Sequence, residues 1–334
     1  MTSDAISDLV AAQSAKIIET RRQFHVMPEL GFEENETAQA IADRLIAAGL
    51  EVETGIGKTG LVGVLKGANP GPTLMIRSDI DGLPVDELTG LEFASTNGRM
   101  HACGHDGHIT MAITAAEILA GMRDQLSGTL IFVFQPAEEI VMGALAMLDD
   151  GLLEKYPADR VIGTHLWNQI PTGIIGVNRA TVFASADQFR LIVHGKGGHG
   201  AMPHKTIDPV AAIAEIISTA QTIVSREVPP NDMGVLTFGQ IHGGSAPNVI
   251  ADSVTVEGTV RAYTAETRVQ IMQSLERIAS NVASAMRATT SFERIHGAPP
   301  VVNDPEVAAW ITQQASLVVG EDHAREWEPV SVGD

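Results

Sequence analysis

The sequence is poor in cysteine, in basic residues and in long apolar runs. A single thiol, that of Cys103, excludes a framework of internal disulfides. Lys and Arg number 22 against 41 Asp and Glu, and the resulting net charge of −19 would repel a phosphate backbone or an anionic membrane. No apolar stretch has the length that a membrane-spanning helix needs. Nucleic acid and membrane are therefore not expected as partners.

The N-terminus also lacks the pattern of a secretory signal. Residues 1–13 carry acids where a signal peptide needs positive charge followed by an apolar run, so we expect a cytoplasmic protein. With 44% hydrophobic residues, the chain can bury a substantial core. Its 334 residues exceed what one core usually supports, which predicts two domains.

The first half of the chain alternates helical and extended patterns. Apolar residues recur at helical spacing in residues 6–24, 37–48 and 107–122. Short apolar runs bounded by turn residues predict buried strands at residues 61–65, 73–76, 130–134 and 161–164. Strands that alternate with helices are typical of a layered α/β sheet.

A different order begins after Thr181. The patterns predict a strand, a helix, two strands, a helix and a strand, at residues 188–194, 209–226, 234–241, 253–263, 266–288 and 290–294. This is the order of a ferredoxin-like unit, which predicts an inserted α+β domain at residues 181–295. Residues 1–180 and 296–334, with a last helix at 306–319, would form the first domain.

Three of the predicted strands are followed at once by side chains that can bind a metal. These side chains are Asp79 and Asp81, Glu138 and Glu139, and His165. In open α/β sheets, ligands bind outside the carboxyl ends of the strands. We therefore expect these residues to converge with the loop of Cys103 on one site.

The stretch MHACGHDGH, Met100 to His108, places three histidines and the only cysteine within nine positions. A thiolate, imidazoles and a carboxylate together suit zinc or a similar first-row divalent ion. A lone cysteine is more often a small buried hydrophobe, but the neighbouring histidines favour a role as ligand. Histidines in a solvated loop are the alternative, although the stretch opens an apolar helix.

The carboxylates also have structural alternatives when each is taken alone. Asp79 and Asp81 could shape a turn with Gly82 and Pro84. Glu138 and Glu139 could act only by stabilising the positive end of a helix dipole. The common position of these side chains after strands favours the metal site. Three further histidines have no such neighbours and are predicted to be ordinary polar residues: His242, His296 and His323.

Several motifs between Arg21 and Arg261 occur in the order found in the M20 metallopeptidase superfamily. They are RRQFHVMPELGFEENETA, RSDIDGLPV, HACGHDGH, FQPAEE, GTHLW, GGHGAMPH and PNVIADSVTVEGTVR. They most resemble the amidohydrolase branch, which includes hippurate hydrolase and hydrolases of N-acyl amino acids and auxin conjugates. The resemblance implies a layered α/β metallohydrolase domain, interrupted by a ferredoxin-like lid domain that also forms a homodimer.

The resemblance also implies roles for individual residues. The implied metal ligands are Cys103, His105, Glu139 and His165. Glu138 matches the general base, and Asp81 matches a carboxylate that orients a metal-binding histidine. In the lid, His199 matches a histidine that reaches the other subunit's site and donates a hydrogen bond to the oxyanion. Asn248 and Arg261 match positions that hold the free carboxylate of the substrate, with a surface salt bridge as the alternative for Arg261.

The implied reaction is hydrolysis of the amide bond of N-acyl amino acids, hippurate-like or N-acetylated, by a metal-activated water. Two ions are expected in the complete site, drawn from Mn²⁺, Zn²⁺, Ni²⁺ and Co²⁺. One alternative is another M20-type aminopeptidase or a biosynthetic deacylase. A second is a non-catalytic metal-binding protein, against which Glu138 argues because a metal store needs no base.

One departure from the family pattern concerns the second metal. The resembling enzymes carry a histidine near their C-terminus that completes the binuclear site, whereas this sequence ends at Asp334 before that segment. His323 comes too early in the pattern to replace it. We expect a truncated form of an active enzyme rather than a protein with an incomplete second site, because the other catalytic residues are present.

Overall fold

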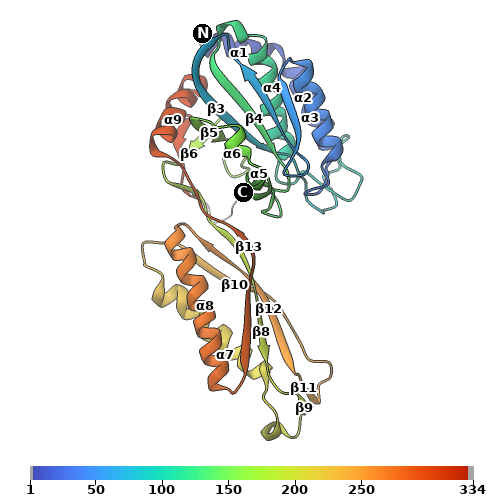
Figure 1. The fold of residues 1–334 in the computed structure, drawn as a ribbon, viewed down its shortest axis with the longest axis vertical. Coiled ribbons are helices and arrows are strands. Elements are labelled where there is room, and N and C mark those ends of the chain that lie inside the picture. The colour runs from blue at the N-terminus through green and yellow to red at the C-terminus, as the bar shows by residue number, and fades with distance from the viewer. Residues whose placement is uncertain (1–2, 330–334) are drawn as a thin grey trace. The chain divides into compact units, whose positions relative to one another are not determined.

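The computed structural model describes residues 3–329 and separates into two compact units. The first unit extends to Ile175 and includes Gln313–Ala324, and the second consists of Gly176–Thr312 and the residues from Arg325 onward. Figure 1 shows the elements of each. No helix among the described residues is long and apolar enough to cross a bilayer. The assignment of these parts to a catalytic and a lid domain stays a prediction, and residues 330–334 of the predicted first domain lie outside the described residues.

The first unit is built on a five-stranded mixed sheet of order β1-β2-β4-β3-β5. The strands are β1 (Glu51–Ile56), β2 (Gly60–Lys66), β3 (Asn69–Asp79), β4 (Ser127–Gln135) and β5 (Arg160–Gly163). β3 runs parallel to both β4 and β5, whereas β2 is antiparallel to β1 and β4. The carboxyl ends of β3, β4 and β5 therefore share one edge of the sheet.

Helices cover both faces of this sheet, because successive side chains of a strand point to opposite sides. Phe132 of β4 packs in a core with residues of α2 (Ser14–His25), α3 (Asn35–Ala47) and α4 (His105–Ala120). The next residue, Val133, packs in a second core with Met147 and Leu152 of α5 (Gly143–Asp149) and α6 (Leu152–Lys155). The predicted layered α/β architecture is confirmed.

The second unit contains an antiparallel sheet of order β10-β12-β8-β13. Its elements follow each other as β8 (Ala186–His194), α7 (Pro209–Thr222), β10 (Gly234–Gly243), β12 (Ser253–Ala262), α8 (Ala265–Ala285) and β13 (Thr289–Ala298). Both helices pack their apolar sides into one core with the sheet. This is the predicted ferredoxin-like order. Asp208 caps the start of α7 by accepting the backbone N–H of Val210 at 2.9 Å.

Some elements differ from the sequence prediction. The helix expected at residues 6–24 is two helices, α1 (Ser3–Ala12) and α2, separated at Gln13. β1, α5 and α6 were not predicted. The remaining elements are α9 (Pro305–Val319), three turns of tighter or wider helix at Arg123–Gln125, Pro203–Lys205 and Ile223–Glu227, and the short strands β6 (Ile175–Val177), β7 (Thr181–Phe183), β9 (Gly198–His199), β11 (Val249–Ile250), β14 (Val301–Val302) and β15 (Ala324–Glu326).

Candidate metal centre

Potential metal ligands gather where β3, β4 and β5 end and α4 begins. Three groups have ligand atoms within 4.8 Å of one another: Cys103, His105 and His165; Asp79, His105 and His108; and His105, Glu138 and Glu139. His105 belongs to all three groups. The first residue of α4 is thus the centre of the cluster, and the ends of the three parallel strands supply its surroundings.

The orientation of His105 is fixed by the segment that follows β3. Its Nδ1 lies 2.9 Å from the backbone oxygen of Asp81 and 3.3 Å from the Oδ1 of the same residue. Because a carbonyl oxygen can only accept, Nδ1 carries the proton and Nε2 presents its lone pair. That Nε2 lies 3.9 Å from an oxygen of Glu138 and 3.9 Å from an oxygen of Glu139.

The thiol lies beside a second imidazole. The Sγ atom of Cys103 is 3.4 Å from Nε2 of His165. Burial raises the pKa of this thiol, but its hydrogen bonds with His105 and His165 outweigh burial and hold the pKa below its ordinary value. A lowered pKa favours the thiolate, which is the form that binds metals.

His108 lies in the cluster, although no role was predicted for it from sequence. Its Nδ1 is 2.6 Å from Oδ1 of Asp79, and its Nε2 accepts the backbone N–H of Leu166 at 2.8 Å. Both ring nitrogens are therefore used within the protein, and His108 holds the residue that follows His165. His108 follows His105 by three residues, so the two side chains lie on the same face of one helix. This spacing could have indicated from sequence that His108 belongs to the cluster.

Asp79 is buried and stays ionised beside His108. Burial raises the pKa of Asp79, but the positive charge of Arg77 and the hydrogen bond from His108 hold the pKa below its ordinary value. Arg77 donates to the other carboxylate oxygen at 2.8 Å. Asp79 therefore anchors His108 rather than merely shaping a turn.

The third histidine of the MHACGHDGH stretch is not part of these groups. His101 is buried, and burial lowers its pKa to about 4. It is thus neutral at physiological pH. His242, His296 and His323 also belong to none of the three groups found among the described residues.

The donors at this site fit a first-row divalent ion. A thiolate, imidazole nitrogens and carboxylate oxygens lie close enough to surround an ion, and the lone-pair nitrogen of His105 faces two of the carboxylates. Such mixed sulfur, nitrogen and oxygen donors suit zinc and similar ions better than calcium or magnesium.

The second unit brings two of the predicted lid residues together. β9 pairs with β11 so that His199 lies opposite Val249, and the N–H of Gly200 donates to the backbone oxygen of Asn248 at 2.8 Å. His199 is exposed, and its Nδ1 accepts the N–H of Ala201 at 3.1 Å. The proton of the neutral ring is therefore on Nε2, which leaves that nitrogen as a hydrogen-bond donor.

Arg261 lies elsewhere in the second unit. It is near the last residue of β12, whereas Asp252, just before that strand, accepts the N–H of Gly197 beside β9. Within residues 3–329 no ion pair involves Arg261. The nearby carboxylate of Asp187 forms an ion pair with Arg268 instead, at 2.7 Å. The alternative of a surface salt bridge for Arg261 is thus not seen in the described part of the chain.

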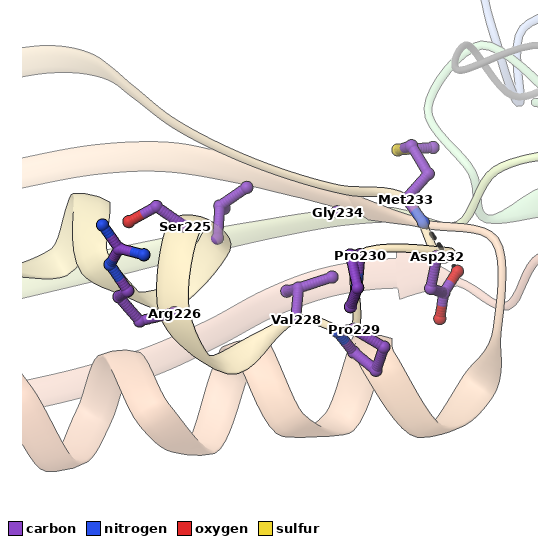
Figure 2. Close-up of a pocket in the computed structure, with 9 residues that line it drawn as sticks. Ser225, Arg226, Val228, Pro229, Pro230, Asp232, Met233 and Gly234 are labelled. Atoms are coloured by element: carbon purple, nitrogen blue, oxygen red, sulfur yellow. Dashed lines mark hydrogen bonds between the residues drawn. The ribbon is translucent and has the colours of Figure 1, made fainter.

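A surface pocket of the second unit holds none of these residues. It is lined by residues between Val224 and Gly234, among which Asp232 is the acid (Figure 2). Asp232 accepts hydrogen bonds from the hydroxyls of Thr264 and Thr267 and from the N–H of Met233. Its role is to fasten the loop to the start of α8.

Comparisons with known proteins identify the family of this chain. Residues 75–334 match the peptidase family M20/M25/M40. An N-acyl-L-amino acid amidohydrolase of Geobacillus stearothermophilus is 41% identical over 92% of this chain and 83% of that protein. Thermostable carboxypeptidase 1 of Saccharolobus solfataricus is 38% identical over 87% of this chain and 75% of that protein. A dinuclear metal-binding peptidase of the M20 family from Bacillus subtilis superposes with a TM-score of 0.82 at 34% identity, over 96% of this chain and 84% of that one.

Proposed function

The chain belongs to the peptidase family M20/M25/M40, and from this premise we propose that it hydrolyses the amide bond of N-acyl amino acids with Glu138 as the general base. It belongs to the amidohydrolase branch and is a hydrolase of amide bonds. The observation that carries the proposal is the position of Glu138, whose carboxylate lies 3.9 Å from the lone-pair nitrogen of His105 within the cluster of ligands.

We propose that Cys103, His105, Glu139 and His165 hold two divalent ions in the complete site, as the dinuclear relative suggests. Such ions lower the pKa of water and polarise the scissile carbonyl when they are bound. Glu138 then accepts the proton of the attacking water and returns it to the departing amine. Asp81 fixes the backbone of Glu139, the residue after the proposed base, by accepting its N–H at 3.0 Å.

The relatives support the proposed substrate class. An N-acyl-L-amino acid amidohydrolase and a carboxypeptidase both release an amine that is an amino acid with a free carboxylate. We propose that Asn248 and Arg261 bind that carboxylate, a task that suits the planar guanidinium. Because the two residues lie near opposite ends of β12, they would come from different subunits of the proposed homodimer. The carboxypeptidase relative keeps peptides open as the second candidate, alongside a biosynthetic deacylase.

A panel of amides tests the substrate class. The purified protein is expected to release free amino acid from N-acetyl and N-benzoyl amino acids, measured as liberated amine. The matched control is the same N-benzoyl amino acid as its C-terminal amide, for which kcat/KM should fall by about tenfold or more, because a charge-assisted hydrogen bond is lost. Faster hydrolysis of dipeptides with a free N-terminus would favour the peptidase alternative.

A further prediction concerns the role of His199 in stabilising the oxyanion of the reaction and in a dimeric active site. We propose a homodimer formed through residues 181–295, in which His199 donates its Nε2–H to the oxyanion in the partner's site. Loss of such a donor typically costs about 3 to 4 kcal/mol, so His199→Ala should lower kcat by about two to three orders of magnitude. His199→Ala mixed with Glu138→Gln should recover activity after subunit exchange, since one site of the mixed dimer then keeps both groups.

Light scattering and differently tagged subunits would verify that mixed dimers form in that experiment. Mixed dimers without recovered activity would place His199 in its own subunit's site or outside catalysis.

A further inference from the structure

The turn that follows β4 carries the proposed base in a strained backbone. Ala137 and Val141 both have positive φ angles, of 49° and 59°. Such angles are uncommon for residues with a side chain and are unfavourable for a β-branched one. Strain of this kind persists only where the surroundings hold it. Glu138 lies between these two residues, so its position depends on whatever holds the turn.

Two buried carboxylates accept the backbone N–H groups on either side of Glu138. Glu34 accepts the N–H of Ala137 at 2.7 Å, and Asp81 accepts the N–H of Glu139 at 3.0 Å. Glu34 comes from just before α3, and Asp81 from just after β3. The two amides that flank the proposed base are thus anchored by segments far from it in sequence.

Glu34 has no exposed surface and makes one other side-chain hydrogen bond among the described residues. Its second oxygen accepts the hydroxyl of Thr59 at 2.6 Å. Burial raises the pKa of Glu34, and the hydrogen bonds from Thr59 and Ala137 oppose that rise. A protonated Glu34 would still accept the N–H of Ala137 through its carbonyl oxygen, so the anchoring needs an acceptor rather than a charge.

The segment before Glu34 also packs closely on the same turn. A Cβ added to Gly31 would lie 3.0 Å from both the Cα and the Cβ of Ala137. Contacts this short require the neighbour to move, and neither the Cα nor the Cβ of Ala137 can move without its backbone. The PELGFEE segment thus fits against Ala137 by contact at Gly31 and by a hydrogen bond at Glu34.

We propose that Glu34 is a positioning residue for amide hydrolysis, because its hydrogen bond to Ala137 fixes the turn on which Glu138 lies. This inference rests on the proposed role of Glu138 as the base. Among the described residues, the side chain of Glu34 hydrogen-bonds to Thr59 and Ala137 and to none of the proposed metal ligands. Its effect is on the geometry of proton transfer, where a displacement of about 1 Å can cost a hundredfold in rate.

Four variants test the proposal. Glu34→Met removes the acceptor at similar size, and kcat is expected to fall by about ten- to a hundredfold at unchanged KM. Glu34→Gln keeps an acceptor and should retain most of the wild-type kcat. Thr59→Val removes only the other hydrogen bond of Glu34, so it should lower the melting temperature and leave kcat within about twofold. Gly31→Ala crowds Ala137 with Glu34 intact and should lower kcat, which supplies a second test if Glu34→Met does not fold.

Two measurements separate this proposal from the proposed function. Hydrogen–deuterium exchange of peptides covering residues 135–142 should be faster in Glu34→Met and unchanged in Thr59→Val, whatever the substrate is. Bound metal should be retained in Glu34→Met, because Asp81 still anchors Glu139. Unchanged exchange, an equal loss of kcat in Thr59→Val, or loss of metal in Glu34→Met would overturn the positioning role.

Discussion

Removal of divalent metal is expected to abolish amide hydrolysis, and added Mn²⁺, Zn²⁺, Co²⁺ or Ni²⁺ should restore it. The groups around His105 are proposed to hold the ion that activates water. Without that ion water stays neutral, and Glu138 alone is too weak a base to deprotonate it. The measurement is release of amino acid from an N-acyl amino acid before and after chelation, with metal content determined by mass spectrometry.

The identity of the restoring ion tests the donor set. Mg²⁺ and Ca²⁺ prefer oxygen ligands and should not restore activity at a site that includes Cys103 and imidazoles. Cys103→Ser replaces the thiolate by a weaker donor, so restoration should then need a higher metal concentration. Full activity in metal-stripped protein would contradict the assignment of a metal-dependent mechanism.

Glu138→Gln should lower kcat by about two to four orders of magnitude while the metal stays bound. Glutamine has nearly the same size as glutamate but cannot accept a proton from water or return one to the amine. The loss should therefore appear in kcat and not in the metal content. Steady-state kinetics together with metal analysis would measure both effects.

Glu139→Gln is the matched control, because it makes the same chemical change one residue along the turn. This variant should bind metal more weakly and should recover activity as metal is added, which Glu138→Gln should not do. Metal loss in Glu138→Gln with retention in Glu139→Gln would show that the two glutamates have been assigned in the wrong order.

The folds of both units were accessible from sequence wherever one face of an element is apolar. The pattern from Gln188 to Arg294 predicted the ferredoxin-like order because its strands and helices alternate buried and exposed positions. β1 was missed because it is an edge strand whose only buried side chain is that of Ile56. The break at Gln13 was missed because no glycine or proline marks it.

The convergence of the candidate ligands was also predictable, for a reason of topology. Asp79 ends β3, and Glu138 and His165 follow β4 and β5 by a few residues. Parallel strands bring their carboxyl ends to one edge, so short distances along the chain became short distances in space. The motifs that resemble the M20 superfamily likewise identified the family that the comparisons show.

The hydrogen bonds that orient these ligands were decided only by the tertiary structure. His108 engages Asp79 and Leu166, and Glu34 reaches the N–H of Ala137 across 103 positions of sequence. Each contact joins segments that meet only when helices pack on the sheet, and no local pattern encodes which buried carboxylate meets which amide. Sequence alone determined most of the long elements, the family and the edge at which the site forms. Packing between distant segments decided how the proposed base is held, because a hydrogen bond depends on distance and angle that periodicity does not specify.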